Sequence, residues 1–413
     1  MPGGERVTTD DVRRALADAI AEQRLRIVAT LIRTTGDWDL AEDAVSDAAE
    51  RALVRWPQDG IPDNPAAWLT TTARRRAIDV LRRADVERAK VADLAAEEAL
   101  APHPEGLPDM SPMTDDRLRL IFTCCHPALP LEARVALTLK IVAGLPTDAI
   151  GRAFLTSEAT MGQRLLRAKG KIANAGIPYR VPSDDLLPAR LDGVLAVVYL
   201  VFTEGYATGA HHLADEAIRL GRLLANLMPD ADEPRALLAL MLLQHARRDA
   251  REVDGERVTL EHQDRSLWDR AAIDEGLRLR PPRRPSRGVY AVQADIAAVH
   301  SLAAHAHDTD WATIVDLYDE LLALTGSPVV ALNRSIAVGM SEGPLAGLAH
   351  LESVSDDPRL VDHHLVAAAR GDLLARAGLH EEAVIAIERA AELAPTDQER
   401  RQLTRRADEL RRG

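Results

Sequence analysis

Aromatic residues are scarce in this sequence of 413 residues: phenylalanine, tryptophan and tyrosine together make up 3% of it, although apolar residues reach 46%. Alanine, leucine and arginine dominate instead, and runs rich in valine, threonine and tyrosine are few. Because strong helix formers outweigh β-branched and aromatic residues, the composition predicts an all-α fold. The chain is too long for one ordinary domain, so we expect two or three.

Cysteine is also rare, with two adjacent residues, Cys124 and Cys125. Neighbouring cysteines suit neither a structural disulfide nor a CxxC metal site, and the surrounding TCCHP offers one histidine. No apolar run approaches the roughly 18 residues of a membrane span, and no signal peptide is recognisable. We therefore expect a cytoplasmic protein that binds neither a metal nor a membrane.

Signatures of catalysis are missing as well. The sequence contains no Walker loop, no GxSxG or HExxH motif and no GxGxxG following a strand. Its histidine pairs have spacings that favour surface or core positions over metal ligation. We therefore predict that the protein is not an enzyme and uses no cofactor.

Basic residues are outnumbered, which gives a net charge of −13, but they are unevenly distributed. The net charge is −1 over residues 1–90, −5 over 91–113, +5 over 114–182 and −12 over 183–413. The choice of partner follows local charge more than the sum, so the one basic block remains suited to nucleic acid.

Three helical blocks follow this division. A first helical module is expected over residues 8–90, a second helical module over 114–177 and a long C-terminal array over 183–413. The stretch 91–113 carries prolines and acidic residues but no basic one. This composition predicts a flexible linker between the two modules.

An acidic helix is expected over residues 37–57, DWDLAEDAVSDAAERALVRWP. Apolar or small residues recur at helical spacing from Leu40 to Trp56 and form one stripe. Much of the remaining surface is acidic and consists of Glu42, Asp43, Asp47 and Glu50. By spacing alone, this surface indicates a solvated helix face.

The next helix is predicted to begin at Asn64 and Pro65, which suit the N-cap and the first helical position. Its apolar residues from Ala73 to Leu81 share one arc at about 100° per residue. The opposite side carries Arg75, Arg76, Arg82 and Arg83. Such a face binds phosphates by charge and counterion release. Arg74 falls nearer the apolar arc, which favours a structural role.

Trp68 lies near the arginine side of the same helix. Two interpretations stay open for it: a platform on which an unpaired base stacks, or a tryptophan of the core.

The order DLAEDAVSDAAERALVRW, a short loop and PAAWLTTTARRRAIDVLRR resembles domain two of extracytoplasmic-function sigma factors. The resemblance implies that the four acidic residues face core RNA polymerase and that the loop Pro57–Asp63 forms a pocket for a flipped base. It also implies that Trp68 and the four arginines contact the −10 element of promoter DNA. The sequence departs from the family pattern at Ser46, commonly glutamine, and at Ala49, commonly aromatic.

Residues 133–172 predict a helix, a Gly-Leu-Pro break, a short helix, a turn and a basic helix. This is helix-turn-helix spacing, in which the last helix enters the major groove. Apolar positions such as Met161, Leu165 and Leu166 would pack the two helices together. Ser157 suits the N-cap of the basic helix. Its exposed side is expected to carry Gln163, Arg164, Arg167, Lys169 and Lys171.

The basic helix with its RLLRAKGKI end resembles the −35-binding domain of the same sigma factors. The resemblance extends over about residues 10–177, and Leu155 stands where the family usually has a turn glycine. The residues it assigns to the −35 element are Ser157, Thr160, Gln163, Arg164, Arg167 and Lys169.

The C-terminal array contains an internal repeat. Gly205, Ala217 and Pro229 recur at the same spacing as Gly371, Ala383 and Pro395, and Ala346 with Pro358 gives a weaker copy in which Arg334 replaces the glycine. This pattern resembles tetratricopeptide repeats, in which helices approach at small residues and a proline ends each unit. The candidate units are 198–231, 327–360 and 364–397.

The array also resembles the C-terminal extension of one group of these sigma factors, at stretches such as YLVFTEGY (199–206). We expect it to regulate the sigma module in cis and to bind a protein or peptide. Its EHQDRSLWDR stretch is unusually polar and could line a ligand pocket or form a salt network. Those polar residues are Glu261, Asp264, Arg265 and Asp269.

The sequence thus predicts an RNA polymerase sigma factor whose partners are core RNA polymerase and promoter DNA. One alternative is a helix-turn-helix regulator with a repeat domain, which would bind duplex DNA but not polymerase. Another is a scaffold or small-molecule receptor without DNA affinity. The arginine helix and the separate linker argue against the first alternative.

Overall fold

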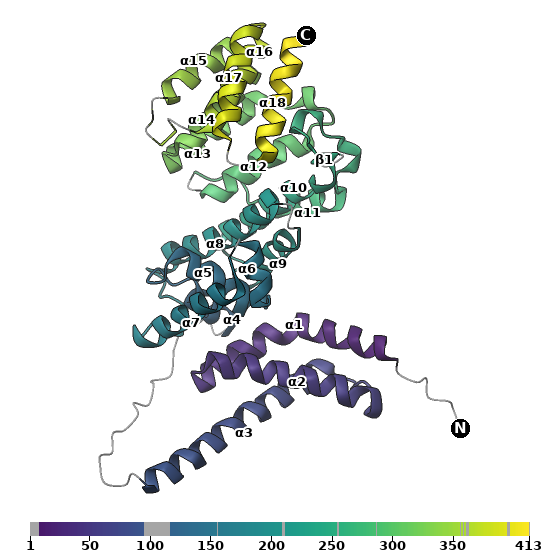
Figure 1. Cartoon of the computed structure of the whole chain (residues 1–413), viewed down its shortest axis with the longest axis vertical. Helices are drawn as coiled ribbons and strands as arrows, with labels where there is room; N and C mark the ends of the chain where they lie inside the picture. Colours follow the sequence, from purple (N-terminus) through teal and green to yellow (C-terminus); the bar gives the residue numbers. More distant parts are fainter. Residues whose placement is uncertain are drawn as a thin grey trace. The chain divides into compact units, whose positions relative to one another are not determined.

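The computed structural model describes residues 8–94, 116–154, 156–208, 211–253, 256–285, 287–355, 357, 359–360, 363–394 and 397–412. Within these residues the chain is helical apart from one short hairpin, so the predicted all-α fold is confirmed (Figure 1). The chain divides into two compact units, residues 1–216 and 217–413. Each unit is described by itself below.

Three helices build the first helical module, and each begins at a side-chain cap. Helix α1 (Thr9–Thr35) has a capping box between Thr8 and Asp11, and helix α2 (Trp38–Asp59) is capped by Asp37. Helix α3 (Pro65–Leu94) begins where the amide of Ala67 donates to Oδ1 of Asn64 at 2.9 Å. A capping side chain satisfies one of the free amides of a first turn, so the predicted start of α3 is confirmed.

Helices α1, α2 and α3 pack against one another pairwise. The predicted stripe of α2 is buried from Leu40 to Trp56, whereas Leu53 at its edge is 46% exposed. Helix α3 continues to Leu94, so the first four residues of the segment predicted as a linker are helical. The rest of that segment lies outside the described residues.

The second helical module consists of α4 (Asp116–Cys124), α5 (Leu131–Leu137), η1 (Thr138–Ala143), α6 (Thr147–Ala153) and α7 (Glu158–Asn174). The segment η1 is a π-helical continuation of α5 and ends at Gly144, whose φ is 81°. Such a left-handed conformation favours glycine, which lacks the Cβ that would clash. Cys124 and Cys125 are buried as free thiols.

Helix α8 (Leu187–Thr208) begins the C-terminal array in sequence, but it packs against α4 and α5 of the second helical module. Arg190 of α8 donates from Nη2 to the carbonyl of Phe122 in α4 at 2.8 Å. The first unit accordingly extends to residue 216, whereas the sequence pattern placed the start of the array at 183. The reason is apolar burial: α8 buries Val194, Leu195, Val197, Val198, Val201 and Phe202.

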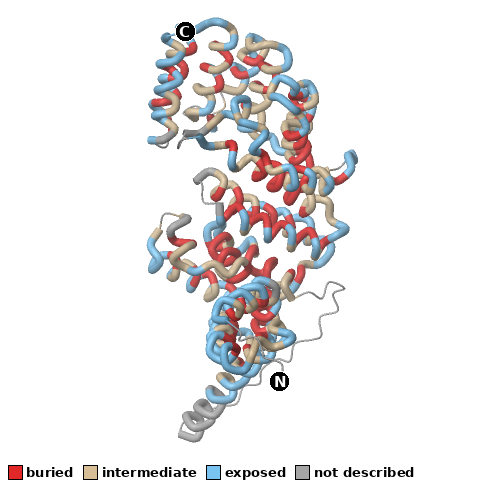
Figure 2. Tube along the Cα trace, turned by 90° about the vertical axis from the view of Figure 1, so that its right-hand side faces the viewer, coloured by how far each residue is buried: buried red, intermediate tan, exposed pale blue. Residues whose placement is uncertain are grey.

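Helix α9 (His211–Leu227) crosses the division between the units. The second unit continues with α10 (Asp232–His245), η2 (Arg248–Ala250), η3 (Leu260–His262), η4 (Arg265–Leu267), α11 (Arg270–Leu279), α12 (Val289–Leu302), η5 (Ala306–Asp308), α13 (Trp311–Thr325), α14 (Pro328–Ser341), α15 (Pro344–Ser355), α16 (His364–Arg376), α17 (His380–Leu393) and α18 (Asp397–Arg412). A hairpin joins β1 (Glu252–Val253) to β2 (Glu256–Arg257) in antiparallel pairing. Helix α10 is buried along almost its whole length, whereas α18 is largely exposed (Figure 2).

Two of the three candidate repeat units coincide with packed helix pairs, α14 with α15 and α16 with α17. In the second pair, a Cβ added at Gly371 would lie 3.2 Å from the carbonyl oxygen of Ala383, as the repeat pattern predicts. In the first pair the close approach is between Gly339 and Gly347, and not between Arg334 and Ala346, the two positions that the repeat pattern indicates. Small residues at these crossings let the helix backbones approach.

Of the three prolines in the repeat pattern, Pro229 is the one that lies among the described residues. Helix α9 ends at Leu227, two residues before Pro229. Pro358 and Pro395 lie outside the described residues.

The polar stretch 261–270 is held by hydrogen bonds and ion pairs within the second unit. Asp264 and Asp269 accept from backbone amides as the N-caps of η4 and α11. Arg265 donates from Nη1 to the carbonyls of His300 and Ala303 at 2.8 and 2.7 Å, at the C-terminal end of α12. Glu261 pairs with Arg376 of α16. Of the two interpretations, these contacts favour a polar network over a ligand pocket.

Because α16 and α17 cross closely at Gly371, we predict that one added methyl group at this position destabilises the protein. A Cβ at Gly371 would lie 2.6 Å from the Ile387 side chain, so Gly371→Ala should lower the free energy of unfolding by about 1–3 kcal/mol. Urea denaturation of the full chain measures this change. Gly170→Ala in α7 is the control, because nothing lies within 4 Å of its added Cβ. Equal stability of the two variants would contradict close packing at Gly371.

Candidate nucleic-acid interface

The outer face of α3 carries three of the predicted DNA-binding arginines in exposed positions: Arg75, Arg82 and Arg83. Ala73 and Ala77 on the opposite face are buried in the module. Two expectations were wrong, because Arg74 and Ile78 are exposed instead of packed. Exposed guanidinium groups keep their donors available to phosphate oxygens.

Arg76 lies at the border of this face and differs from its neighbours. Its Nε donates to Oδ2 of Asp47 on α2, so a predicted DNA-binding residue pairs with a predicted polymerase-binding residue. Both side chains are about one-third exposed. The pair joins α2 to α3, and it leaves less of the Arg76 charge for an outside partner.

Trp68 is half-buried near the start of α3. Its ring meets that of the buried Trp56 edge to face, with centroids 5.5 Å apart and an interplanar angle of 72°. This arrangement is favourable for aromatic pairs. Trp68 therefore has a packing role while part of its surface stays open.

The loop between α2 and α3 is shorter than predicted. Helix α2 continues through Pro57 to Asp59 and is followed by Gly60, so the loop spans residues 60–64. The amide of Gly60 still donates to the carbonyl of Trp56 at 3.0 Å. The first residues of the predicted base pocket are thus helical.

The four acidic residues predicted to form one face of α2 differ in how exposed their side chains are. Asp43 and Glu50 are exposed, and Asp47 pairs with Arg76. The side chain of Glu42 is only 14% exposed. It is covered by Arg24 of α1 and by residues of the second helical module, described below.

Helices α6 and α7 form the predicted helix-turn-helix. The turn closes where the amide of Thr156 donates to the carbonyl of Gly151 at 2.9 Å, and a Cβ at Gly151 would lie 2.9 Å from the carbonyl of Thr156. Gly151 is therefore the residue that permits the close turn. Leu155, the position at which a turn glycine was expected, lies outside the described residues.

Ser157 caps α7, as predicted. Its Oγ accepts from the amide of Thr160 at 3.2 Å and lies 2.8 Å from the Thr160 hydroxyl. A cap of this kind fixes where the helix begins, and with it which side chains of the first turn point outward.

The exposed face of α7 carries Thr160, Gln163, Arg167 and Lys171. Two expectations for this helix were wrong. Leu166 is 59% exposed instead of packed. Arg164 is half-buried and lines a small apolar groove with Val135, Phe154 and Met161.

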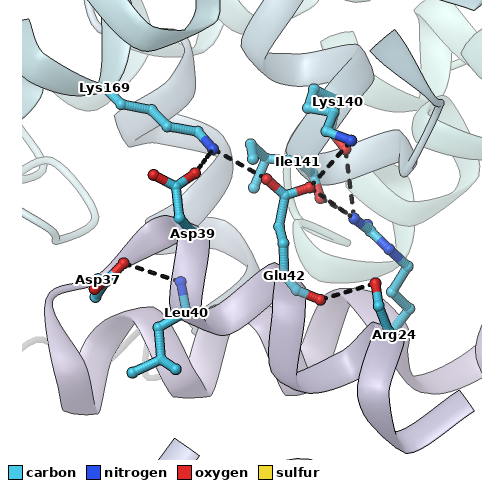
Figure 3. A network of polar contacts seen from close by, with 9 residues as sticks. Arg24, Asp37, Asp39, Leu40, Glu42, Lys140, Ile141 and Lys169 are labelled. Carbon is cyan, nitrogen blue, oxygen red and sulfur yellow. Dashed lines mark hydrogen bonds and ion pairs between the residues drawn. The ribbon is translucent and has the colours of Figure 1, made fainter. Parts of the chain in front are cut away.

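Lys169 is the largest departure from the predicted interface (Figure 3). Its side chain is 13% exposed, and its Nζ lies 2.6 Å from Oδ1 of Asp39 and 3.0 Å from Oε2 of Glu42. At about 100° per residue it lies about 120° around the helix from Gln163, on the side that faces α2. Lys169 of the predicted DNA-binding set thus pairs with Glu42 of the predicted polymerase-binding set.

The other residues of this contact were not predicted from the sequence. Arg24 of α1 donates from Nη1 to the carbonyl of Ile141 at 2.9 Å, and Lys140 lies 3.6 Å from Glu42. Arg33 of α1 pairs with Asp116 of α4 at 2.9 Å. These partners lie more than 80 residues apart in sequence, so helical periodicity carries no signal of their pairing.

The described residues contain no helix long and apolar enough to cross a membrane. Among the same residues, no group of three histidine, cysteine or acidic side chains is placed to hold a metal ion.

Removing the cap of α7 should weaken the helix. We expect Ser157→Ala to lower the free energy of unfolding by about 1 kcal/mol, because the amide of Thr160 loses its acceptor. Ser157→Asp keeps an acceptor at the same place and is the matched control. Urea denaturation of both full-length variants tests this. Unchanged stability of Ser157→Ala would contradict the capping role.

Comparison with known families follows the same division of the chain. Residues 19–86 match sigma-70 region 2, residues 119–172 match sigma-70 region 4, and residues 190–281 match DUF6596, a family of unknown function. An uncharacterized protein from Rhizobium meliloti (strain 1021) is 42% identical over 407 residues, which cover 95% of each chain. No solved structure matches. The chain therefore belongs to the sigma-70 factors, with region 2 and region 4 followed by a C-terminal extension.

Proposed function

We propose that this sigma factor brings core RNA polymerase to promoters by dividing the work between its two helical modules. The first helical module binds polymerase through α2 and the −10 element through α3. The second helical module binds the −35 element through α7. The single observation that carries this proposal is the exposed arginine face of α3, next to an acidic helix in a module that matches sigma-70 region 2.

Three side chains form the core of the proposed −10 surface: Arg75, Arg82 and Arg83. They are exposed on one side of α3, and a guanidinium group is a strong ligand for phosphate. Trp68 is near enough in sequence and exposed enough to offer an aromatic edge beside an unpaired base. We give Arg76 a smaller part, because Asp47 already holds it.

The proposed −35 surface is the exposed face of α7. Gln163 can present a bidentate amide to adenine, and Arg167 can reach a guanine or a phosphate. Ser157 and Thr160 at the start of the helix offer hydroxyl and amide donors to the backbone. Arg164 is half-buried and contributes less to this surface, and Lys169 belongs to it only after a change in its present surroundings, since its side chain is covered.

Transcription reconstituted from purified core polymerase, the full chain and promoter DNA tests the proposal. We expect the triple variant Arg75→Ala, Arg82→Ala, Arg83→Ala to lose promoter opening because phosphate contacts are removed. Its salt dependence should become shallower by roughly 0.7–0.9 units of slope per lost contact.

The matched control removes the same charge from another exposed helix, with Arg401→Ala, Arg406→Ala and Arg412→Ala in α18. We expect it to transcribe like the unchanged chain. If the α3 variant stays folded and transcribes as well as this control, the −10 assignment is wrong. DNA binding without any polymerase-dependent transcription would favour a helix-turn-helix regulator instead.

We also propose that the C-terminal array regulates the sigma module in cis. The support is helix α8, the first helix of that array, which packs against α4 and α5 and bonds to Phe122 through Arg190. A displacement of α8 therefore changes the packing of the module that contains the recognition helix α7. The acidic remainder of the array, part of a block of net charge −12, disfavours its own binding to DNA.

Two truncations separate packing from regulation. A chain ending at residue 208 keeps α8 and should fold, with altered promoter activity. A chain ending at 182 loses α8, exposes apolar side chains of α4 and α5, and should be markedly less stable. Thermal unfolding and promoter-directed transcription at matched concentrations measure both effects. If the chain ending at 208 matched the full chain in transcription, regulation in cis would be excluded.

A further inference from the structure

A small groove lies where α5, α7 and α8 meet, three helices that are labelled in Figure 1. Helix α5 packs against both of the others. Three of the residues that line the groove are at most 3% exposed: Val135, Ala136 and Met161. Phe154 and Leu200, which are half-buried, line it as well. The groove therefore has an apolar interior that is fixed by the packing of these helices.

The size of the groove limits what it can hold. Its volume is about 130 Å³. A cavity of about 150 Å³ holds benzene, so this groove suits a group of roughly four to six carbon atoms. Sites for cofactors and drug-sized molecules usually measure about 300–1,000 Å³. The groove is thus too small for a nucleotide and fits the apolar side chain of a small metabolite.

Two charged side chains line the same groove. Glu132 of α5 is exposed, and Arg164 of α7 is half-buried. Within the described part of the chain, neither side chain has a hydrogen bond or an ion pair. A half-buried guanidinium group without a partner has lost part of its hydration and gained no ion pair in return, which favours an incoming carboxylate.

These opposite charges favour a ligand that carries both signs. A simple carboxylic acid would pair with Arg164 but would bring its negative charge near Glu132, and a simple amine would do the reverse. An α-amino acid has a carboxylate and an ammonium group on one carbon atom, directly beside its side chain. It can therefore pair with both residues while the side chain enters the apolar interior.

We propose that this groove binds a free α-amino acid whose apolar side chain has about the size of leucine. The side chain lies beside Met161 and Phe154. The carboxylate pairs with Arg164, and the ammonium group pairs with Glu132.

The site has a consequence for DNA binding, and this part of the inference rests on the proposed function. Arg164 lies on α7, the helix that carries the proposed −35 surface. A bound carboxylate holds the guanidinium group of Arg164 in the groove, so the amino acid and DNA compete for it. The free amino acid therefore lowers the affinity of the chain for the −35 element.

The methyl group of Met161 reports binding directly, because this residue is fully buried and lines the groove. The chain has seven methionines, so NMR of the full chain with methyl-labelled methionine gives few resonances. Met161→Leu, which nearly conserves volume, identifies the resonance. Titration with L-leucine should shift it saturably, with a Kd on the order of 1 mM. L-alanine lacks the larger side chain and should bind roughly tenfold more weakly.

A pair of probes tests the two charged contacts. Isocaproate is leucine without its amino group, so it keeps the side chain and the carboxylate. Glu132→Gln should weaken leucine binding roughly fivefold and should not weaken isocaproate binding, because the lost ion pair involves the ammonium group. Arg164→Gln should weaken the binding of both probes. If Glu132→Gln affects both probes equally, or if the unchanged chain binds isocaproate more tightly than leucine, the proposed contacts are wrong.

Filling the groove tests its apolar interior. Leu200→Phe adds a ring at a half-buried lining position and should weaken leucine binding roughly tenfold. Leu186→Phe makes the same change at a position that is 54% exposed and does not line the groove, so it should bind leucine like the unchanged chain. Thermal unfolding shows whether both variants are folded. Equal leucine binding by the two folded variants overturns the site.

Two further results of the titration overturn the site. One is a Met161 resonance that does not move at about ten times the expected Kd. The other is a resonance that moves with protein concentration in the absence of leucine, because the occupant of the groove is then a second copy of the chain.

Competition with DNA is measured separately, by fluorescence anisotropy of a −35 duplex with the full chain. We expect saturating leucine to lower the affinity for this duplex a few-fold. Leucine binding without any change in this affinity overturns the competition. A chain that binds leucine but no promoter DNA overturns the proposed function, whereas the NMR titration supports the site without DNA or polymerase.

Discussion

Close approach of helix backbones is the constraint on which this structure depends, because an alanine-rich, aromatic-poor chain has few large side chains with which to fill gaps. Interaxial distances between helices are set by the residues at their crossing points. Gly339 with Gly347, and Gly371 with Ala383, bring helices of the second unit together. A few of the large rings do fill the interior, among them Trp56 in the first helical module and Phe122 in the second, both at most 1% exposed.

Much of the helical architecture could be predicted from local signals. A cap is a short-range feature, so Asn64 and Ser157 were identified correctly as helix starts. The apolar stripe of α2 was found because its period is 3.6 residues. The same reasoning was wrong for Arg74, Ile78 and Leu166, which are exposed. Periodicity defines an arc on a helix, but the width of the buried arc depends on how many neighbouring helices cover it.

Contacts between distant segments could not be predicted in this way. Lys169 looked like one more basic residue of the recognition helix, and nothing near it in sequence reveals Asp39 and Glu42 as partners. The wheel of α7 did contain a hint, since Lys169 lies on the flank of the buried stripe formed by Met161, Leu165 and Ala168. Whether the side chain of Lys169 faces solvent or an ion-pair partner depends on the position of α2, which the local sequence does not show.

The boundary between the matched families does not coincide with the boundary between the compact units, and α8 lies between the two boundaries. The region 4 match ends at residue 172 and the DUF6596 match begins at 190, which suggests a clean junction between them. Yet α8 packs on α4 and α5, and the first unit extends to residue 216. Helix α8 cannot shift without disturbing the apolar side chains that it packs against α4 and α5, and packed interiors resist such change. The first helix of the extension is thus part of the packing of the module that carries α7. The polar contacts of α1 and α2 hold that same module as well, so it is restrained by apolar packing through α8 and by displaceable charge through Glu42. The charged restraint is the one that salt and a charged partner weaken directly, because ion pairs are screened and apolar packing is not.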